Sequence, residues 1–101
     1  MKLYFDHEHY EYLTESELLA SYHQLRRENH TETEDYFDYV RDATSKNGTL
    51  QKMSDTHIID RLHEMCTRHQ TLTRDRFIGD AERQLAAIVD LCDAITRAER
   101  E

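Results

Sequence analysis

Hydrophobic and polar positions at the start of the chain alternate in short blocks, a pattern that predicts two strands. Aromatic and aliphatic residues fill positions 3–5 and most of positions 10–13, and a polar stretch from Asp6 to His9 separates them. Short aromatic-rich runs on either side of a polar connection are typical of a β-hairpin. Because an isolated hairpin is only marginally stable in water, we expect this one to lie against a helix.

Two capping boxes further along predict two short helices. Thr14 and Glu17 can exchange side-chain hydrogen bonds with each other's backbone amides, and Thr31 and Glu34 can do the same. The first box precedes an apolar stripe at helical spacing, formed by Leu18, Leu19, Tyr22 and Leu25. The second precedes a shorter apolar face of Tyr36, Phe37, Val40 and Ala43, with Tyr39 at its edge. Gly48 suits the left-handed position that often ends a helix.

Steps of three and four residues between apolar positions dominate the second half of the chain. One stripe is Ile58, Leu62, Met65, His69 and Leu72, and the other is Ile78, Ala81, Leu85, Ile88, Cys92 and Ile95. The two stripes are out of phase, so residues 71–75 form either a turn between antiparallel helices or a phase shift within one long helix. We favour the turn because Thr73 can cap a helix and Asp75 suits a first turn.

Together these elements predict a single mostly helical α+β domain over residues 1–101. Residues 1–53 supply an N-terminal β-hairpin, two short capped helices and a connector whose Leu50 and Met53 turn inward. Residues 54–101 supply a helical hairpin or a long helix. The absence of proline and the presence of only two glycines favour long helices. Because the core is thin, we expect self-association as a homodimer through Ile78, Leu85, Ile88 and Ile95.

The charge balance bears on the kind of partner. The net charge is −8, and 34% of residues are charged. Direct nucleic-acid binding normally needs a basic surface, so the expected partner is a protein with a basic surface. No run of about 18 apolar residues predicts a membrane span, and the start of the chain is not typical of a leader. Cys66 and Cys92 are interpreted as buried free thiols, which favours a cytoplasmic location.

The best metal candidates lie on one predicted helix but do not share a face. They recur at every third position, as His57, Asp60, His63, Cys66 and His69. Each step of three drifts by about 60° around a straight helix, so four zinc ligands cannot converge without help from His7, His9 or a second chain. We therefore expect neither metal nor cofactor. There is also no nucleophile motif or phosphate-binding loop, so we expect no enzyme, with a zinc module as the minor alternative.

An acidic row on the second predicted helix is the strongest functional signal. Carboxylates recur along it, and tyrosines, which are common at binding hot spots, flank it. The candidate partner-binding residues are Glu34, Asp35, Asp38, Tyr39 and Asp42. Such a row can present negative charges at spacings comparable to those of DNA phosphates. The alternative is an ordinary solvated face opposite a core stripe of Phe37 and Val40.

Residues 1–53 also resemble a known group of proteins. The sequence MKLYFD, then YLTESEL, then TETEDYFDYVRDATSKNGTLQKM is similar to the start of small acidic proteins of phages and plasmids of low-GC Gram-positive bacteria. It is less closely similar to type II anti-CRISPR proteins. This resemblance implies an inhibitor in the bacterial cytoplasm that binds the RNA-guided type II nuclease. Several such inhibitors act as DNA mimics, so the resemblance also implies this mode of binding. Residues 54–101 carry no such resemblance. The alternative is a structural or regulatory phage or plasmid adaptor that dimerises through its C-terminal helices.

Overall fold

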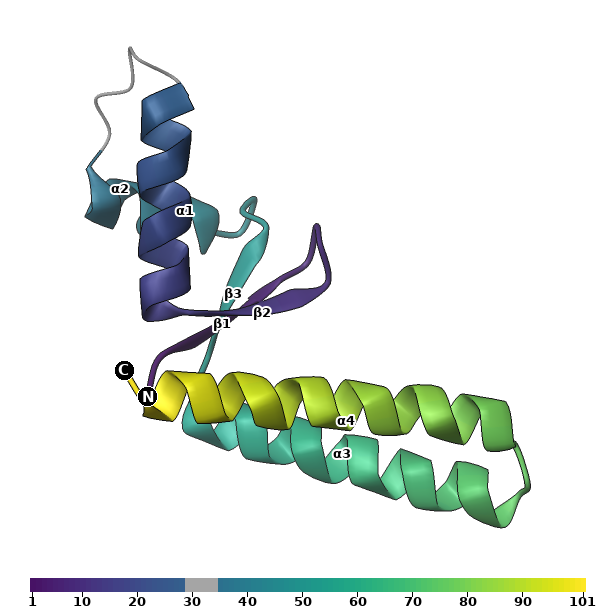
Figure 1. The fold of residues 1–101 in the computed structure, drawn as a ribbon. Helices are drawn as coiled ribbons and strands as arrows, with labels where there is room; N and C mark the ends of the chain where they lie inside the picture. The colour runs from purple at the N-terminus through teal and green to yellow at the C-terminus, as the bar shows by residue number, and fades with distance from the viewer. Residues whose placement is uncertain (29–34) are drawn as a thin grey trace.

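The computed structural model describes residues 1–28 and 35–101, which form a mostly helical α+β structure (Figure 1). Its strands are β1 (Leu3–Asp6), β2 (Glu11–Thr14) and β3 (Leu50–Met53). Its helices are α1 (Glu15–Glu28), α2 (Tyr36–Ala43), α3 (Asp55–Arg74) and α4 (Ile78–Glu99). The predicted fold class is confirmed, with one correction: the segment predicted as a connector contains a third strand. None of the described helices is long and apolar enough to cross a membrane.

The sheet is antiparallel and has the order β2-β1-β3, so the first strand lies in the middle. Leu3 pairs with Thr14 on one side and with Met53 on the other. Successive side chains of a strand point to opposite faces. All four residues of β1 are buried, which requires cover on both faces of the sheet. Figure 1 shows this cover, with the α3/α4 hairpin on one face and α1 and α2 on the other.

The larger core lies between the sheet and the α3/α4 hairpin. Its buried residues are Leu3, Phe5, Met53, Ile58, Met65, Leu91, Ala94 and Ala98. Small alanine side chains let the last turns of α4 lie close to the strands. Arg61 covers the edge of this core, because its guanidinium carbon lies 5.1 Å from the centre of the Phe5 ring and its Nε donates to the Tyr12 hydroxyl at 2.9 Å.

The smaller core lies on the opposite face, where only Tyr4, Leu18 and Leu50 are buried in the apolar cluster. A carboxylate joins the layers here: Glu15 accepts hydrogen bonds from the hydroxyls of Tyr4 at 3.3 Å and Tyr36 at 3.1 Å. Burial and the nearby negative charge of Glu15 raise the pKa of both tyrosines. The ring of Tyr22 lies 5.6 Å from that of Tyr36 and 5.4 Å from that of Tyr39.

Helix starts on this side were predicted with mixed success. The box of Thr14 and Glu17 is confirmed, since each side chain bonds the other's amide at 3.3 and 3.0 Å. The box of Thr31 and Glu34 lies outside the described residues, and Asp35 caps α2 instead by accepting from the Asp38 amide at 2.8 Å. The prediction that Phe37 is in the core is wrong: it is 82% exposed, because α2 turns Tyr36, Tyr39 and Val40 toward the sheet.

Gly48 is needed for space rather than for a left-handed backbone. No described glycine has a positive φ, which corrects the predicted role of Gly48. A Cβ at this position would lie 1.9 Å from the carbonyl oxygen of Ala43, a distance that no side chain tolerates.

The second half forms a helical hairpin, as favoured from the phase of its stripes, but the turn lies later than predicted. Residues 71–74 still belong to α3, so Thr73 caps nothing. Asp75 ends that helix, and Arg76 makes the turn with φ 63°. The predicted α4 stripe is right only in part: Ala81 is buried and Ile88 and Ile95 pack against the larger core, but Ile78 and Cys92 are exposed. Leu85 is exposed, whereas Leu91 is fully buried, because α4 packs against the sheet as well as against α3.

Candidate functional site

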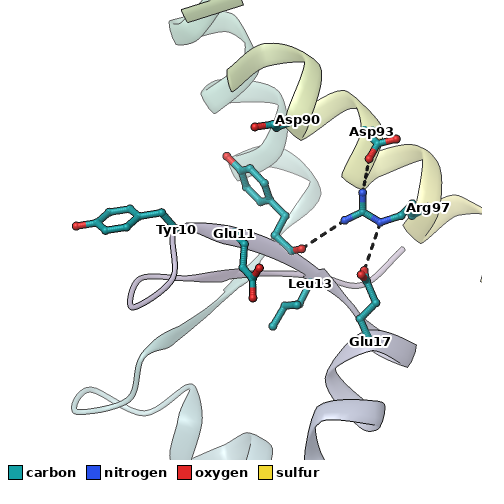
Figure 2. A pocket seen from close by; sticks show the side chains of 8 residues that line it. Tyr10, Glu11, Leu13, Glu17, Asp90, Asp93 and Arg97 are labelled. Carbon is teal, nitrogen blue, oxygen red and sulfur yellow. Dashed lines mark hydrogen bonds and ion pairs between the residues drawn. The ribbon is translucent and has the colours of Figure 1, made fainter. Parts of the chain in front are cut away.

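An acidic groove of about 240 Å³ runs between β2 and α4 (Figure 2). Its lining comes from three parts of the chain that are far apart in sequence. These residues are Tyr10, Glu11, Tyr12 and Leu13 of the hairpin, Glu17 of α1, and Asp90, Asp93 and Arg97 of α4.

Arg97 fixes the geometry of one end of the groove. Its guanidinium donates to the Tyr12 carbonyl at 3.4 Å and to the Glu17 carboxylate at 3.4 Å, and it also pairs with Asp93. Burial alone would raise the pKa of Glu17, but hydrogen bonds from Thr14 and the charge of Arg97 hold it below its ordinary value. Arg97 thus ties α4 to both the sheet and α1, and its positive charge is already balanced by two carboxylates.

One carboxylate of the groove remains available. Among the described residues, the exposed side chain of Asp90 makes no hydrogen bond or ion pair, whereas the Glu11 carboxylate points to the other side of β2, toward Asp6 and His9. The carboxylates of Glu17, Asp90 and Asp93 therefore share one guanidinium, that of Arg97, so the groove is negative overall. A negative concave surface attracts cationic groups and raises their association rate.

Tyr10 stands at the outer end of this groove, where its ring projects away from the strands (Figure 2). It is 82% exposed and has φ 53°, a backbone conformation that costs an ordinary residue roughly 1–2 kcal/mol. The sequence analysis placed Tyr10 in a strand, but β2 begins at Glu11. Tyrosine is among the residue types enriched at binding hot spots.

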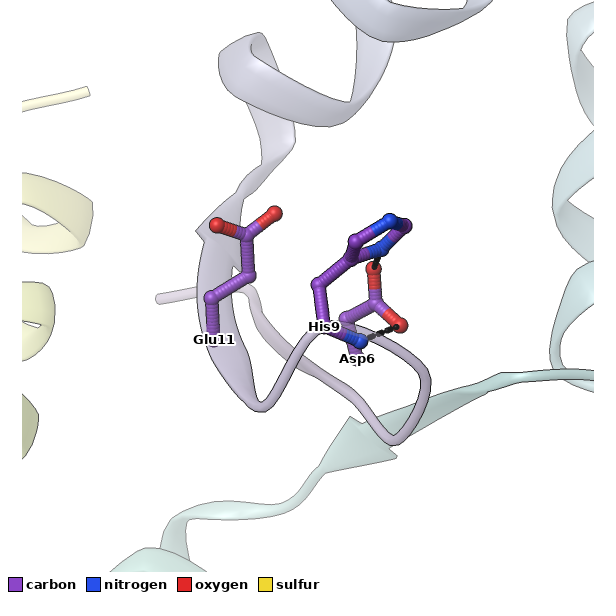
Figure 3. A group of neighbouring side chains, drawn as sticks. All are labelled: Asp6, His9 and Glu11. Carbon is purple, nitrogen blue, oxygen red and sulfur yellow. Dashed lines mark hydrogen bonds and ion pairs between the residues drawn. The ribbon is translucent and has the colours of Figure 1, made fainter.

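A small polar cluster orders the hairpin turn behind the groove (Figure 3). Asp6 is 7% exposed, and one of its oxygens accepts from the amides of Glu8 at 2.8 Å and His9 at 3.2 Å. Its other oxygen lies 2.9 Å from Nδ1 of His9. This hydrogen bond raises the pKa of His9. Burial alone would raise the pKa of Asp6, but the bonds from His9 and the two amides lower it.

Possible metal ligands converge in this turn. Atoms of Asp6, His9 and Glu11 lie within 4.8 Å of one another, the one such group among the described residues. Structural zinc sites use four protein ligands, and both oxygens of Asp6 already have partners. His7 lies elsewhere, with its ring 4.9 Å from that of Phe5. The cluster therefore serves the conformation of the turn.

The acidic row predicted on α2 lies on the other face of the sheet. Asp35 is used as a helix cap, and Tyr39 is half-buried against Tyr22. Asp38 pairs with Arg41 at 2.7 Å, and Asp42 lies 4.0 Å from the same guanidinium. Glu34 lies outside the described residues. The structure therefore does not gather these carboxylates into an unpaired row, and their part in partner binding stays a prediction.

The predicted self-association residues separate into two pairs. Ile78 and Leu85 are exposed, whereas Ile88 and Ile95 are half-buried against the larger core.

Comparison with known proteins found no match to a protein-family model, to a curated protein or to a solved structure.

Proposed function

We propose that this chain is a non-catalytic inhibitor that binds a basic surface of another protein, and that the groove between β2 and α4 receives cationic side chains of that partner. The observation that carries the proposal is the unpaired Asp90 carboxylate, which lines the groove beside Asp93 and Glu17 and opposite a single guanidinium, that of Arg97. The resemblance of residues 1–53 supplies the candidate partner, the RNA-guided type II CRISPR nuclease.

The groove suits an arginine or lysine side chain for three reasons. Free carboxylates form strong charge-assisted hydrogen bonds with guanidinium and ammonium groups. Tyr10 and Tyr12 offer aromatic surface along the same groove, to which cations are attracted. The walls are also preorganised, since Arg97 bridges them and Asp6 holds the hairpin turn, so little conformational entropy is lost on binding.

The composition of the groove supports binding rather than catalysis. Its lining has no serine, cysteine, lysine or histidine side chain that would act as a nucleophile or as its base. The net charge of −8 favours fast association with a basic partner at low salt, and screening over about 8 Å weakens this attraction at physiological salt.

The test is a titration of the nuclease–guide complex at two salt concentrations, with DNA cleavage measured in parallel. Three double variants that each remove two charges separate the possible surfaces. Asp90→Asn with Asp93→Asn changes the groove, Asp38→Asn with Asp42→Asn changes the α2 row, and Asp60→Asn with Glu99→Gln changes exposed carboxylates away from both.

We expect the groove variant to weaken binding about tenfold or more, since charged pairs at interfaces contribute a few kcal/mol. The Asp60/Glu99 control should change affinity less than about twofold, because isolated surface charges act only through the screened field. A larger loss from the α2 variant would move the binding site to the acidic row. Equal losses from all three would remove the groove from the proposal, and no binding or inhibition by the wild type would remove this nuclease as the partner.

A further inference from the structure

Burial separates two basic side chains from the others. Arg61 and Arg97 are half-buried, whereas the remaining arginines and the lysines are exposed. Arg97 has two carboxylates beside it, those of Glu17 and Asp93. Arg61 forms no ion pair with any residue of the described ranges 1–28 and 35–101. Because a charge that is partly removed from water is costly without a counterion, Arg61 lacks a compensation that Arg97 has.

The guanidinium of Arg61 is nevertheless held in one place. Its Nε donates to the hydroxyl of Tyr12 at 2.9 Å, and its central carbon lies 5.1 Å from the centre of the Phe5 ring. Both contacts orient the group, but neither the hydroxyl nor the ring carries a full negative charge. The two terminal amino groups have no hydrogen-bond partner among the described residues, so the fork that they form is free to bind an anion.

A cavity of about 300 Å³ lies beside this guanidinium, between α3 and α4. Its lining consists of Arg61, Glu64, Met65, Arg68, Gln84 and Ala87. Arg68 pairs with Glu64 at 3.6 Å, so two guanidiniums share one carboxylate and the lining keeps one positive charge. The side-chain amide of Gln84 has no hydrogen-bond partner within the described chain and adds a free donor.

We propose that this cavity, which we call the Arg61 pocket, binds a single carboxylate group. A carboxylate is planar and accepts two parallel hydrogen bonds from a guanidinium fork. Gln84 lies on the opposite wall, on α4, and can donate to the same group. Met65, which is 9% exposed, and Ala87 supply apolar surface for the carbon atoms that carry the carboxylate.

The charges around the Arg61 pocket favour one carboxylate over a phosphate polymer. The acidic groove adjoins the pocket, because Tyr12 lines the groove and also accepts the hydrogen bond from Arg61. A polyanion would meet Asp90 and Asp93 there, and like charges in contact are unfavourable. A single carboxylate carries no second charge toward the groove. The Arg61 pocket can be tested on the isolated chain, so it stands or fails independently of the proposed function.

The test follows the NMR signal of the Arg61 Nε–H group in the full chain as acetate replaces chloride at constant ionic strength. Arg27, an exposed arginine with no ion pair among the described residues, is the internal control. Gln84→Glu is nearly isosteric and offers the two guanidiniums a carboxylate of the chain itself. Asn47→Asp makes the same change from amide to acid at an exposed position before β3 and is the matched control. Thermal melts verify that both variants are folded.

We expect the Arg61 signal to shift and to saturate with acetate, while the Arg27 signal changes little. Gln84→Glu should weaken acetate binding about tenfold or more, because its own carboxylate occupies the fork. Asn47→Asp should change it less than about twofold, because a distant exposed charge acts only through the screened field. An Arg61 shift that does not saturate, or that Arg27 matches, overturns the proposal. Unchanged acetate binding in Gln84→Glu overturns it too.

Two further ligands identify the chemistry and the source of the anion. Inorganic phosphate that saturates the Arg61 signal at much lower concentration than acetate would overturn the assignment to a carboxylate. A capped peptide with one aspartate between alanines distinguishes a protein side chain from a small free carboxylate. Binding at least as tight as that of acetate supports an acidic side chain of a protein as the ligand, and weaker binding supports a small free carboxylate.

Discussion

On the α3/α4 face of the sheet the buried side chains are almost all aliphatic, whereas the α1/α2 face is held largely by tyrosines and one carboxylate. Eight residues are buried in the first cluster and three in the second. On the second face, Glu15 links Tyr4 to Tyr36, and the ring of Tyr22 contacts those of Tyr36 and Tyr39. The two faces of the sheet are thus covered differently, one by apolar packing and one by aromatic rings and hydrogen bonds. We expect the first to be more sensitive to cavities and the second to be more sensitive to high pH.

Cavities should destabilise the aliphatic face more than the aromatic one. Leu91→Ala removes a fully buried side chain from the larger core, and we expect a loss of about 3–5 kcal/mol in the free energy of unfolding. Leu18→Ala should cost about 2–3 kcal/mol, since the half-buried neighbours of Leu18 can move into the space. Urea denaturation measures both, and Leu25→Ala is the exposed control, with a loss below about 1 kcal/mol. Equal losses at Leu91 and Leu18 would contradict this difference.

The two glycines should respond to the same substitution with opposite signs. Gly48→Ala places a Cβ against the backbone of Ala43 on the α1/α2 side, so we expect a loss of about 1–3 kcal/mol. Gly79 lies in the first turn of α4 with no atom within 4 Å of an added Cβ, so Gly79→Ala should stabilise the protein by roughly 0.5–1 kcal/mol. Thermal melts should therefore move down for the first variant and up for the second. Two shifts of the same sign would be inconsistent with the structure.

High pH should act on the aromatic face. The folded-state pKa of Tyr4 and Tyr36 is raised by burial and by Glu15, so ionisation favours the unfolded chain. The stability that these neutral hydroxyls contribute is fully present below the unfolded pKa of about 10 and is lost as the pH rises above it. Tyr36→Phe should cost about 1 kcal/mol at pH 8 and should reduce the loss between pH 9 and 11. An unchanged pH slope in this variant would argue against the role given to Glu15.

The smallest effect is expected at the hairpin turn. The pKa of His9 is raised and that of Asp6 is lowered. His9 therefore contributes stability at a pH below its unfolded pKa of about 6.5, and Asp6 contributes stability at a pH above its unfolded pKa of about 3.9. The bond between them stabilises the fold most at a pH between these two values. An NMR titration should place the pKa of His9 above the ordinary value for histidine, and Asp6→Asn should lower it. A His9 pKa that does not respond to Asp6→Asn would contradict the observed bond.

Local features of the fold were predictable from sequence, and features that depend on distant segments were not. The capping box of Thr14 and Glu17 involves residues three apart, so its chemistry is visible in the sequence. The buried face of α4 was not fully predictable from the sequence, because Leu91 and Ala98 on that face pack against a sheet formed by the first 53 residues. Phe37 has the same hydrophobicity as a core residue, and only the packing of α2 against Tyr22 leaves it exposed.

The groove escaped prediction for the same reason. Tyr12 and Asp90 line one groove only after the sheet and α4 pack, and no spacing in the sequence relates them. A positive φ at Tyr10, a residue that rarely adopts one, could not be foreseen either. The charge of −8, by contrast, indicated an acidic surface in advance, although it did not indicate where the carboxylates gather.

Leu3 and Ala98 belong to one cluster although almost the whole sequence separates them, and this determines the order in which the protein can fold during synthesis. Strands β1 and β2 can pair as soon as they leave the ribosome, but β3 follows only after α2. The face of the sheet that carries Leu3, Phe5 and Met53 then stays uncovered until the last turns of α4 have been made. Such long-range closure slows folding relative to purely local helical contacts, and the exposed apolar face of the nascent chain is a natural substrate for chaperones.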